Sequence, residues 1–126
     1  DAGFMPIIAP VAVRSPEATP HGGLLLNVNA DTAAGEIALA LGAERLVFLT
    51  DVDGVMDSSR RVIPRLTRRQ ASGLMSSRVV AGGMVPKIGA CLRALEEVGS
   101  THIIDGRKPH ALRDILSGAE LGTRVG

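Results

Sequence analysis

Tryptophan and tyrosine are absent from this chain of 126 residues, and Phe4 and Phe48 are its two aromatic residues. The aromatic side chains on which single-stranded nucleic acids stack are therefore almost missing. The formal net charge is +1, so the chain also lacks the strong positive charge that is typical of nucleic-acid-binding proteins. These deficits argue against a nucleic acid as a partner.

Cysteine and long hydrophobic runs are scarce as well. Cys91 is the single cysteine, and its place on the apolar face of an expected helix indicates a core thiol in a reducing compartment. No apolar run is long enough to cross a membrane, and no basic-then-apolar signal segment is present. We therefore expect a cytoplasmic protein that makes no membrane contact.

Lysine is rare, because twelve of the fourteen basic residues are arginine and only Lys87 and Lys108 are lysine. Lys87 follows Gly82-Gly83 in the first turn of an expected helix, and no Ser, Thr, Asp or Asn stands at the cap position. A lysine at the positive end of the helix dipole is unfavourable without an anion. Glycines, first-turn amides and a lysine favour a phosphate site, although a plain turn with a solvated lysine would give the same residues.

The apolar content of 45% is enough for the core of one domain or part of one. Because the chain starts with Asp1 and not with Met, we expect it to be a piece of a longer chain. Periodicity predicts strands over 4–13, 24–28, 46–49, 101–104 and 123–125, helices over 31–41, 68–75, 85–98 and 109–116, a loop over 14–23 and a small hairpin within 57–64. The apolar run over 24–28 could form a buried strand, and the order strand, helix, strand over 24–49 predicts a parallel crossover unit.

Polar residues follow two of these strands, at the edge where parallel sheets bind ligands. Asn27, Asn29 and Asp31 lie at one strand-to-helix turn. Helix capping by Asn29 or Asp31 would explain them, but a carboxylate there could also hold a lysine or lie near magnesium, and an amide could donate to a substrate carboxylate. Residues 50–54 follow the next strand and lack the later ligands of a calcium loop.

Several common site types are excluded by their missing patterns. The chain has neither the G-x-x-x-x-G-K-[ST] motif of P-loop enzymes nor the G-x-G-x-x-G motif of dinucleotide enzymes. His21, His102 and His110 are far apart and have no ligand spacing, so no protein-bound metal site is predicted.

Four segments, in this order along the chain, together resemble the acetylglutamate kinases of the amino acid kinase family: residues 27–34, 49–55, 82–87 and 102–107. The resemblance covers nearly the whole chain. It implies an α/β fold of the carbamate kinase-like type, in which a mainly parallel open sheet lies between helix layers in a three-layer αβα sandwich. Residues 1–126 resemble the C-terminal, ATP-binding half of that fold, and we expect the N-terminal, substrate-binding half to be absent.

The resemblance also implies a reaction and a role for particular residues. Family members transfer the γ-phosphoryl group of ATP, with Mg²⁺, to the side-chain carboxylate of N-acetyl-L-glutamate in arginine biosynthesis. Lys87 would stabilise the transferring phosphoryl group, and Asp31 would orient the catalytic lysines. Asn27 would contact N-acetylglutamate, with Asn29 beside it in the same turn. The nucleotide site would be lined by Thr50, Asp51, Val52, Asp53, Gly54, Val55, Met56, Val79, Val80, Ala81, Gly82 and Gly83.

Two parts of the family's active site have no counterpart in this chain: the glycine-rich loop with its own lysine, and the arginine that holds the α-carboxylate of the substrate. We therefore expect the isolated chain to bind nucleotide weakly at most and to need the other half for turnover. Apolar surface left without that half would favour self-association, so a homo-oligomer is open. Two alternatives also stay open: a sister kinase acting on an aminoadipate derivative, glutamate or a nucleotide, and a non-catalytic nucleotide-binding module, against which Lys87 and Asp31 argue.

Overall fold

The structure is a computed structural model that describes residues 3–14, 24–77 and 79–126. In chain order its elements are β1 (Val11–Val13), β2 (Leu25–Asn27), α1 (Ala30–Ala40), β3 (Arg45–Thr50), β4 (Arg65–Leu66), α2 (Arg68–Ser76), α3 (Met84–Ala94), β5 (Ser100–Asp105), α4 (Ala111–Leu116) and β6 (Thr123–Val125). Within the described ranges, no helix has the length and hydrophobicity that a bilayer-spanning segment needs.

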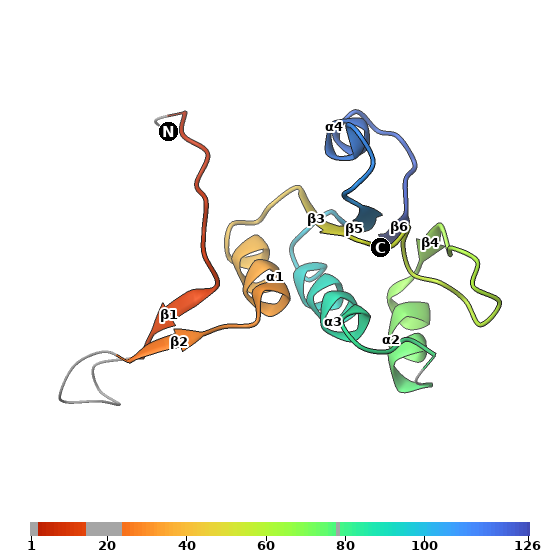
Figure 1. The fold of residues 1–126 in the computed structure, drawn as a ribbon, viewed down its shortest axis with the longest axis horizontal. Helices are drawn as coiled ribbons and strands as arrows, with labels where there is room; N and C mark the ends of the chain where they lie inside the picture. Colours follow the sequence, from red (N-terminus) through yellow and green to blue (C-terminus); the bar gives the residue numbers. More distant parts are fainter. Residues whose placement is uncertain (1–2, 15–23, 78) are drawn as a thin grey trace.

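The main sheet has the strand order β3-β5-β6-β4. β5 pairs with β3 in parallel and with β6 in antiparallel orientation, and β4 pairs with β6 in parallel. Figure 1 shows α1, α2 and α3 on one face of this sheet and α4 on the other. The predicted α/β class with three αβα layers is therefore confirmed, and the antiparallel β5–β6 pair makes the sheet mixed.

The central strand β5 is covered on both faces, because neighbouring residues of a strand point to opposite sides. Ile103 is fully buried and belongs to the larger hydrophobic cluster, together with Ile88 of α3. Ile104 belongs to a smaller cluster with Ala111 and Ile115 of α4. The two clusters fix β5 between the helix layers and so fix the position of its carboxyl end.

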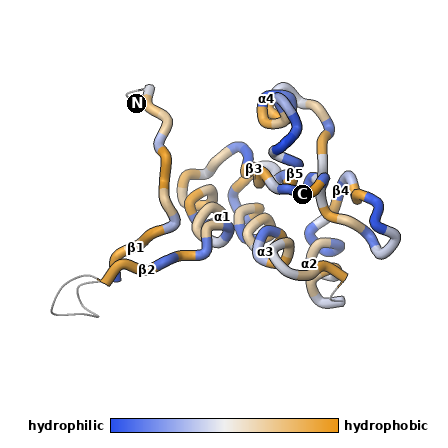
Figure 2. Tube along the Cα trace, in the orientation of Figure 1, coloured by the Kyte–Doolittle hydropathy of each residue, from blue (hydrophilic) through white to orange (hydrophobic). Residues whose placement is uncertain are grey.

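β1 and β2 form a separate antiparallel pair that projects from the helices at the left of Figure 1. The strand predicted over 4–13 begins only at Val11, directly after Pro10. Residues before Pro10 have no strand partner in the described chain, and Phe4 and Ile7 are 87% and 96% exposed. Figure 2 shows this segment as an arm rich in apolar residues beside the helices. The predicted strand was too long because a strand also needs a neighbour for its backbone groups.

The strand predicted over 24–28 forms as β2, but the interpretation that it is buried was wrong, because Leu25 is 72% exposed. β2 and β3 belong to different sheets, so the described residues do not form the predicted crossover unit over 24–49. A hydrophobic run is buried only where a second surface covers it, and the pattern does not say which surface that is. The loop predicted over 14–23 lies, apart from residue 14, outside the described residues.

Local signals set the starts of α1 and α2. Asn29 caps α1 by accepting a hydrogen bond from the backbone N–H of Thr32 at 3.0 Å. Thr67 caps α2 as predicted and forms a capping box with Gln70. Where a small hairpin was predicted within 57–64, the structure has a turn closed by a single antiparallel bridge between Met56 and Val62.

α3 and α4 differ from their predicted ranges by a few residues. α3 begins at Met84, so Pro86 is its third residue and not its first, still within the turn whose N–H groups have no partner inside the helix. α3 ends at Ala94 and not at residue 98, because the N–H of Glu97 bonds three residues back to the Ala94 carbonyl at 3.1 Å. α4 begins at Ala111, because His110 has a φ of 63°, outside the helical region.

Cys91 lies in the core on the inner face of α3, as its sequence position predicted. Its side chain is fully buried, and burial raises the pKa of the thiol to about 11. The group is therefore protonated at neutral pH.

We expect the Cys91 thiol of the folded protein to react very slowly with DTNB at pH 8. Burial blocks the reagent, and with a pKa three units above the pH only on the order of 0.1% of the group is the reactive thiolate. Release of thionitrobenzoate would measure the rate, with the chain in guanidinium chloride as the control. Labelling at the same rate in both conditions would contradict the buried position.

Candidate functional site

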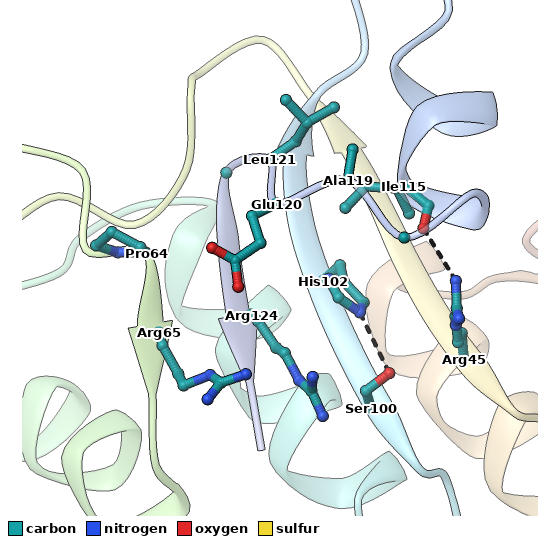
Figure 3. Close-up of a pocket in the computed structure, with 12 residues that line it drawn as sticks. Arg45, Pro64, Arg65, Ser100, His102, Ile115, Ala119, Glu120, Leu121 and Arg124 are labelled. Carbon is teal, nitrogen blue, oxygen red and sulfur yellow. Dashed lines mark hydrogen bonds between the residues drawn. The ribbon is translucent and has the colours of Figure 1, made fainter.

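Two regions of the molecule gather polar side chains, and the first is a pocket of about 550 Å³ on the α4 face of the sheet. Its lining includes three arginines, Arg45 of β3, Arg65 of β4 and Arg124 of β6, together with His102 of β5 (Figure 3). His102 lies opposite Arg124, which lies opposite Arg65, so the strand register places these three side chains in one row.

The pocket is basic and contains polar atoms without a partner. His102 contacts the hydroxyl of Ser100 through Nε2 at 3.2 Å, but within the described part of the chain its Nδ1 and the Nε of Arg124 are buried without a hydrogen bond. Burial, with Arg124 and Arg45 nearby, lowers the pKa of His102 below its ordinary value. None of the residues that sequence reasoning selected lines this pocket, so it is distinct from the predicted site.

The second region lies where α1 and α3 begin, and an ion pair joins them there. Nζ of Lys87 lies 3.0 Å from Oδ2 of Asp31, and the two side chains are 22% and 19% exposed. Asp31 is in the first turn of α1, where a carboxylate also interacts favourably with the helix dipole. The lysine that the sequence places at an unfavourable helix end is thus held by a carboxylate from another helix.

The close packing of α1 against α3 brings these two residues together. A Cβ on Gly35 of α1 would lie 3.1 Å from the Cα, Cβ and carbonyl oxygen of Ala90 on α3. Asp31 is one turn before Gly35, and Lys87 is one turn before Ala90, so both stand at the same end of the helix pair. The absence of a side chain at Gly35 lets the two helix starts approach each other.

The turn before α3 fits the expected phosphate cradle in part. Gly82 has a φ of 58°, and a Cβ on Gly82 or Gly83 would meet nothing within 4 Å, so the space around the turn is open. No side chain caps α3, as predicted. The amides of Met84 and Val85 are not free, however, because they donate to Ala81 and Gly82 carbonyls at 3.4 and 3.3 Å, near the upper limit of such bonds.

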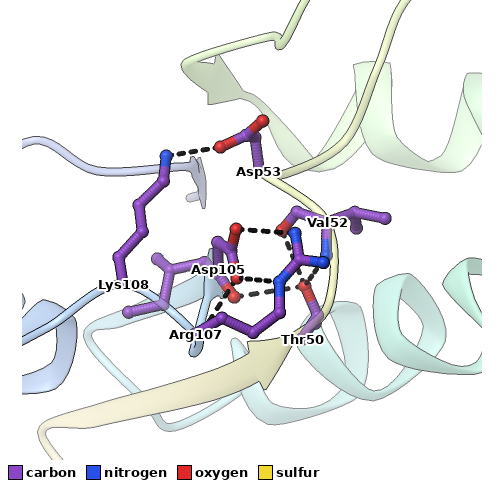
Figure 4. Close-up of polar contacts among 7 residues, drawn as sticks. Thr50, Val52, Asp53, Asp105, Arg107 and Lys108 are labelled. Carbon is purple, nitrogen blue, oxygen red and sulfur yellow. Dashed lines mark hydrogen bonds and ion pairs between the residues drawn. The ribbon is translucent and has the colours of Figure 1, made fainter.

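The carboxyl ends of β3 and β5 lie side by side, since Thr50 pairs with Asp105. α3 leads directly into β5 and packs on it in the opposite direction, so the turn before α3 lies toward the same carboxyl ends. Thr50, the last residue of β3, places its hydroxyl oxygen 3.1 Å from the Ile104 carbonyl oxygen, and its own carbonyl accepts from the N–H of Gly106 at 2.9 Å. Further out, Lys108 forms an ion pair with Asp53 (Figure 4). Residues 50–53 are therefore fastened to the turn between β5 and α4.

Asp105 ends β5 and is held by Arg107 in a bidentate pair. Its Oδ1 accepts from the backbone N–H and from Nε of Arg107 at 3.0 and 2.9 Å, and its Oδ2 accepts from Nη2 at 2.9 Å (Figure 4). These hydrogen bonds from Arg107 lower the pKa of Asp105 to about 2. The carboxylate is thus fully ionised at neutral pH and is already occupied.

The remaining residues of the predicted nucleotide site fall into two groups. Asp51, Val79 and Ala81 are exposed, and Val52 and Met56 are partly exposed. The side chains of Val55 and Val80 lie in the larger hydrophobic cluster instead, with exposures of 0% and 8%. Gly54 is also buried, because a Cβ there would meet the Thr123 hydroxyl at 2.8 Å. Only part of the predicted lining therefore has a free side chain.

The two asparagines predicted for substrate binding stand before Asp31. Asn27 is the last residue of β2, pairs with Val11 and is exposed. The side-chain oxygen of Asn29 accepts from the N–H and the hydroxyl of Thr32 at 3.0 and 3.1 Å. Capping therefore uses this oxygen, as one of the two interpretations of the sequence requires.

Sequence reasoning did not include Arg107, Lys108, Gly35 or Thr123 in the site. The rarity of lysine could have pointed to Lys108, and the motif 105–107 at a strand end could have pointed to Arg107. Gly35 and Thr123 act through packing and hydrogen bonds with residues distant in the chain, so no local pattern reveals them.

Comparisons of the sequence with known proteins all match the amino acid kinase family. The chain matches the model of the "Amino acid kinase family" over residues 1–105. It is similar to proteins named acetylglutamate kinase from Synechococcus sp. (43% identity over 99% of this chain), Nautilia profundicola (44% over 97%) and Nitrobacter hamburgensis (46% over 91%). The chain spans only 41%, 43% and 39% of the length of these relatives.

Solved structures agree with the fold. An N-acetylglutamate synthase from Neisseria gonorrhoeae, complexed with coenzyme A and L-arginine, matches 84% of this chain and 25% of its own, with a TM-score of 0.74 and 28% identity. A carbamate kinase from Giardia lamblia bound to AMP-PNP matches 82% of this chain and 34% of its own, with a TM-score of 0.70. The two sequences are 24% identical, so this comparison shows a similar fold and nothing more.

Replacement of Gly35 by alanine should loosen the α1–α3 contact. The new Cβ would press on backbone atoms of Ala90, and we expect a loss of about 1 kcal/mol or more in the free energy of unfolding. Gly73→Ala in α2 is the matched control, because nothing lies within 4 Å of its Cβ and alanine there should add about 0.5–1 kcal/mol. Urea unfolding measures both, and equal effects would show that Gly35 is not needed for close packing.

Replacement of Asp105 by asparagine should change how stability depends on pH. The folded pKa of about 2 lies below the ordinary value of 3.8, so this carboxylate contributes stability that is complete above about pH 4 and is lost as the pH falls through 2. The difference between wild type and Asp105→Asn in urea midpoint should therefore be largest near pH 6 and shrink toward pH 2. In an Arg107→Met background, which removes the partner of Asp105, the effect of Asp105→Asn on the urea midpoint should be smaller. An effect of Asp105→Asn that stays constant at all pH values would contradict the low pKa of Asp105.

Proposed function

Because the chain belongs to the amino acid kinase family, we propose that it is the ATP-binding portion of an acetylglutamate kinase. The proposed reaction transfers the γ-phosphoryl group of ATP to the side-chain carboxylate of N-acetyl-L-glutamate, a step of arginine biosynthesis. The names of the relatives support this choice. The observation that carries it is the ion pair between Lys87 and Asp31 at the joint start of α1 and α3.

Lys87 has the properties that phosphoryl transfer requires of a charged residue. Such a reaction asks the protein for positioning and for stabilisation of charge on the transferring oxygens, with little covalent chemistry. A compact ammonium suits this task, and partial burial strengthens its field. Asp31 holds Nζ of Lys87 in one place, so the charge is positioned before a ligand arrives.

The acceptor explains why no general base is needed. A side-chain carboxylate is already ionised at neutral pH, so no proton has to be removed before it attacks phosphorus. In the described part of the chain, the candidate site consists of the Lys87 ammonium and the Asp31 carboxylate. The histidine that could act as a base elsewhere, His102, lies in the separate pocket on the other face of the sheet.

For ATP, we propose that the open turn at Gly82–Gly83 and the start of α3 receive phosphate groups. The exposed parts of residues 50–56 and 79–81 would receive the nucleoside. Mg²⁺ would enter with the phosphates and neutralise part of their charge. No group of three His, Cys, Asp or Glu side chains within the described ranges could hold a metal ion. The protein therefore contributes the ammonium of Lys87 and the backbone of the turn.

The rest of the active site belongs, in this proposal, to chain that these residues do not include. The relatives are more than twice as long, and the acceptor-binding half with its glycine-rich loop would come from that additional length. Asn27 and Asn29 would contact N-acetylglutamate at the boundary between the halves. A cytoplasmic location and a homo-oligomer are parts of the same proposal, and a sister kinase of the family is the second candidate.

Mg-ATP should raise the melting temperature of the chain, because a ligand that binds only the native state stabilises it. At a ligand concentration 100 times the Kd, the gain is about 2.7 kcal/mol. Lys87→Ala should reduce the rise, and Arg93→Ala is the matched control, since Arg93 lies in the last turn of the same helix and is exposed. A thermal-shift titration of the three proteins gives the answer. No rise in wild type, or an equal rise with Lys87→Ala, would contradict phosphate binding at the start of α3.

A further inference from the structure

We propose that Lys108 is a positioning residue of the nucleotide site, acting through Asp53 to hold residues 51–54 in a binding-competent conformation. The inference rests on the proposed function, because this loop is part of the proposed nucleotide site. Lys108 is one of only two lysines, and the family resemblance gives a role only to the other.

Both ends of the loop are fixed by neutral hydrogen bonds. At its start, the Thr50 carbonyl accepts from the N–H of Gly106, directly after β5, and the Thr50 hydroxyl accepts from the N–H of Val52 at 3.2 Å. At its end, the N–H of Val55 donates to the Thr123 hydroxyl at 2.8 Å, and that hydroxyl donates to the Ile63 carbonyl at 2.7 Å. Between these two fixed ends, residues 51–54 form a short connecting segment.

In the middle of this short segment, Asp53 forms the charged contact. Its Oδ1 meets Nζ of Lys108, which projects from the turn after β5 (Figure 4). Asp105 also attracts this lysine, but Arg107 already hydrogen-bonds both of its carboxylate oxygens. The pair with Asp53 raises the pKa of Lys108, so the lysine is charged throughout the neutral range.

Because the Lys108–Asp53 pair is exposed, it can affect nucleotide affinity without contributing much to the stability of the fold. The side chains of Lys108 and Asp53 are 56% and 50% exposed, and ion pairs in such positions contribute little to the free energy of unfolding. An anchor in a ligand-binding loop acts mainly by reducing the entropy lost when the ligand binds. The expected effect is therefore on nucleotide affinity, with the melting temperature of the free protein nearly unchanged.

Calorimetric titration of the chain with Mg-ATP tests this role. Lys108→Met and Asp53→Asn should each weaken binding by about 3- to 10-fold, the cost of ordering one or two residues. Lys108→Arg should stay within about twofold of wild type, because it keeps the charge. The control Arg113→Met removes a similarly exposed ion pair, with Asp114 on α4, and should leave affinity unchanged. The ratio of wild-type to Lys108→Met affinity should fall at 0.5 M KCl, where charges on the surface are screened.

A double charge exchange, Lys108→Asp with Asp53→Lys, distinguishes positioning from direct contact with phosphate. Recovery of at least half of the lost affinity supports positioning, because the pair is restored with reversed signs. Binding weaker than in Lys108→Met would overturn it, since an aspartate at 108 then repels a phosphate that the lysine had contacted. Equal affinity of wild type and Lys108→Met would also overturn it while the proposed function stands. No binding by wild type would overturn both.

Discussion

The contact between α1 and α3 is the constraint on which the candidate site depends. Two helices approach this closely only where one of them has no side chain, and Gly35 supplies that position against Ala90. Asp31 and Lys87 stand one turn away from this contact, where a difference of an ångström in helix separation would open or close their ion pair. A packing detail in the core thus controls the position of the charge at the surface.

Most charges at the candidate site lie in compensated pairs. Each of the two lysines contacts an aspartate from a different part of the chain, and Asp105 is paired with Arg107. The candidate site therefore carries specific, directed charges without a large net field. The α4 face differs, since its pocket combines three arginines with the single acidic side chain of Glu120. The two faces of one sheet thus offer different electrostatic environments.

Much of the fold could be predicted because its signals are local. Caps such as Asn29 and Thr67, the periods of α1 and α2, and the apolar runs of β3 and β5 depend on residues a few positions apart. The partner of β2, and the burial of Val55 and Val80, depend on which surfaces meet and could not be predicted. In the site, the motif indicated Lys87 and Asp31, and their contact is present. The ties from Lys108 and Thr123 to the loop became visible only once the strands were placed side by side.

The order of strands in the main sheet also bears on how the chain folds. β4 ends at residue 66, yet its only partner in the described sheet, β6, begins at Thr123. In the same way, β3 precedes its partner β5 by a long stretch of chain. In the main sheet only β5 and β6 are consecutive described strands that pair directly, while the β3–β5 and β4–β6 ladders each close a long loop. High contact order slows folding and leaves strand edges open while it proceeds. Among the described strands, β3 and β4 therefore have no partner in the main sheet until β5 and β6 have been synthesised.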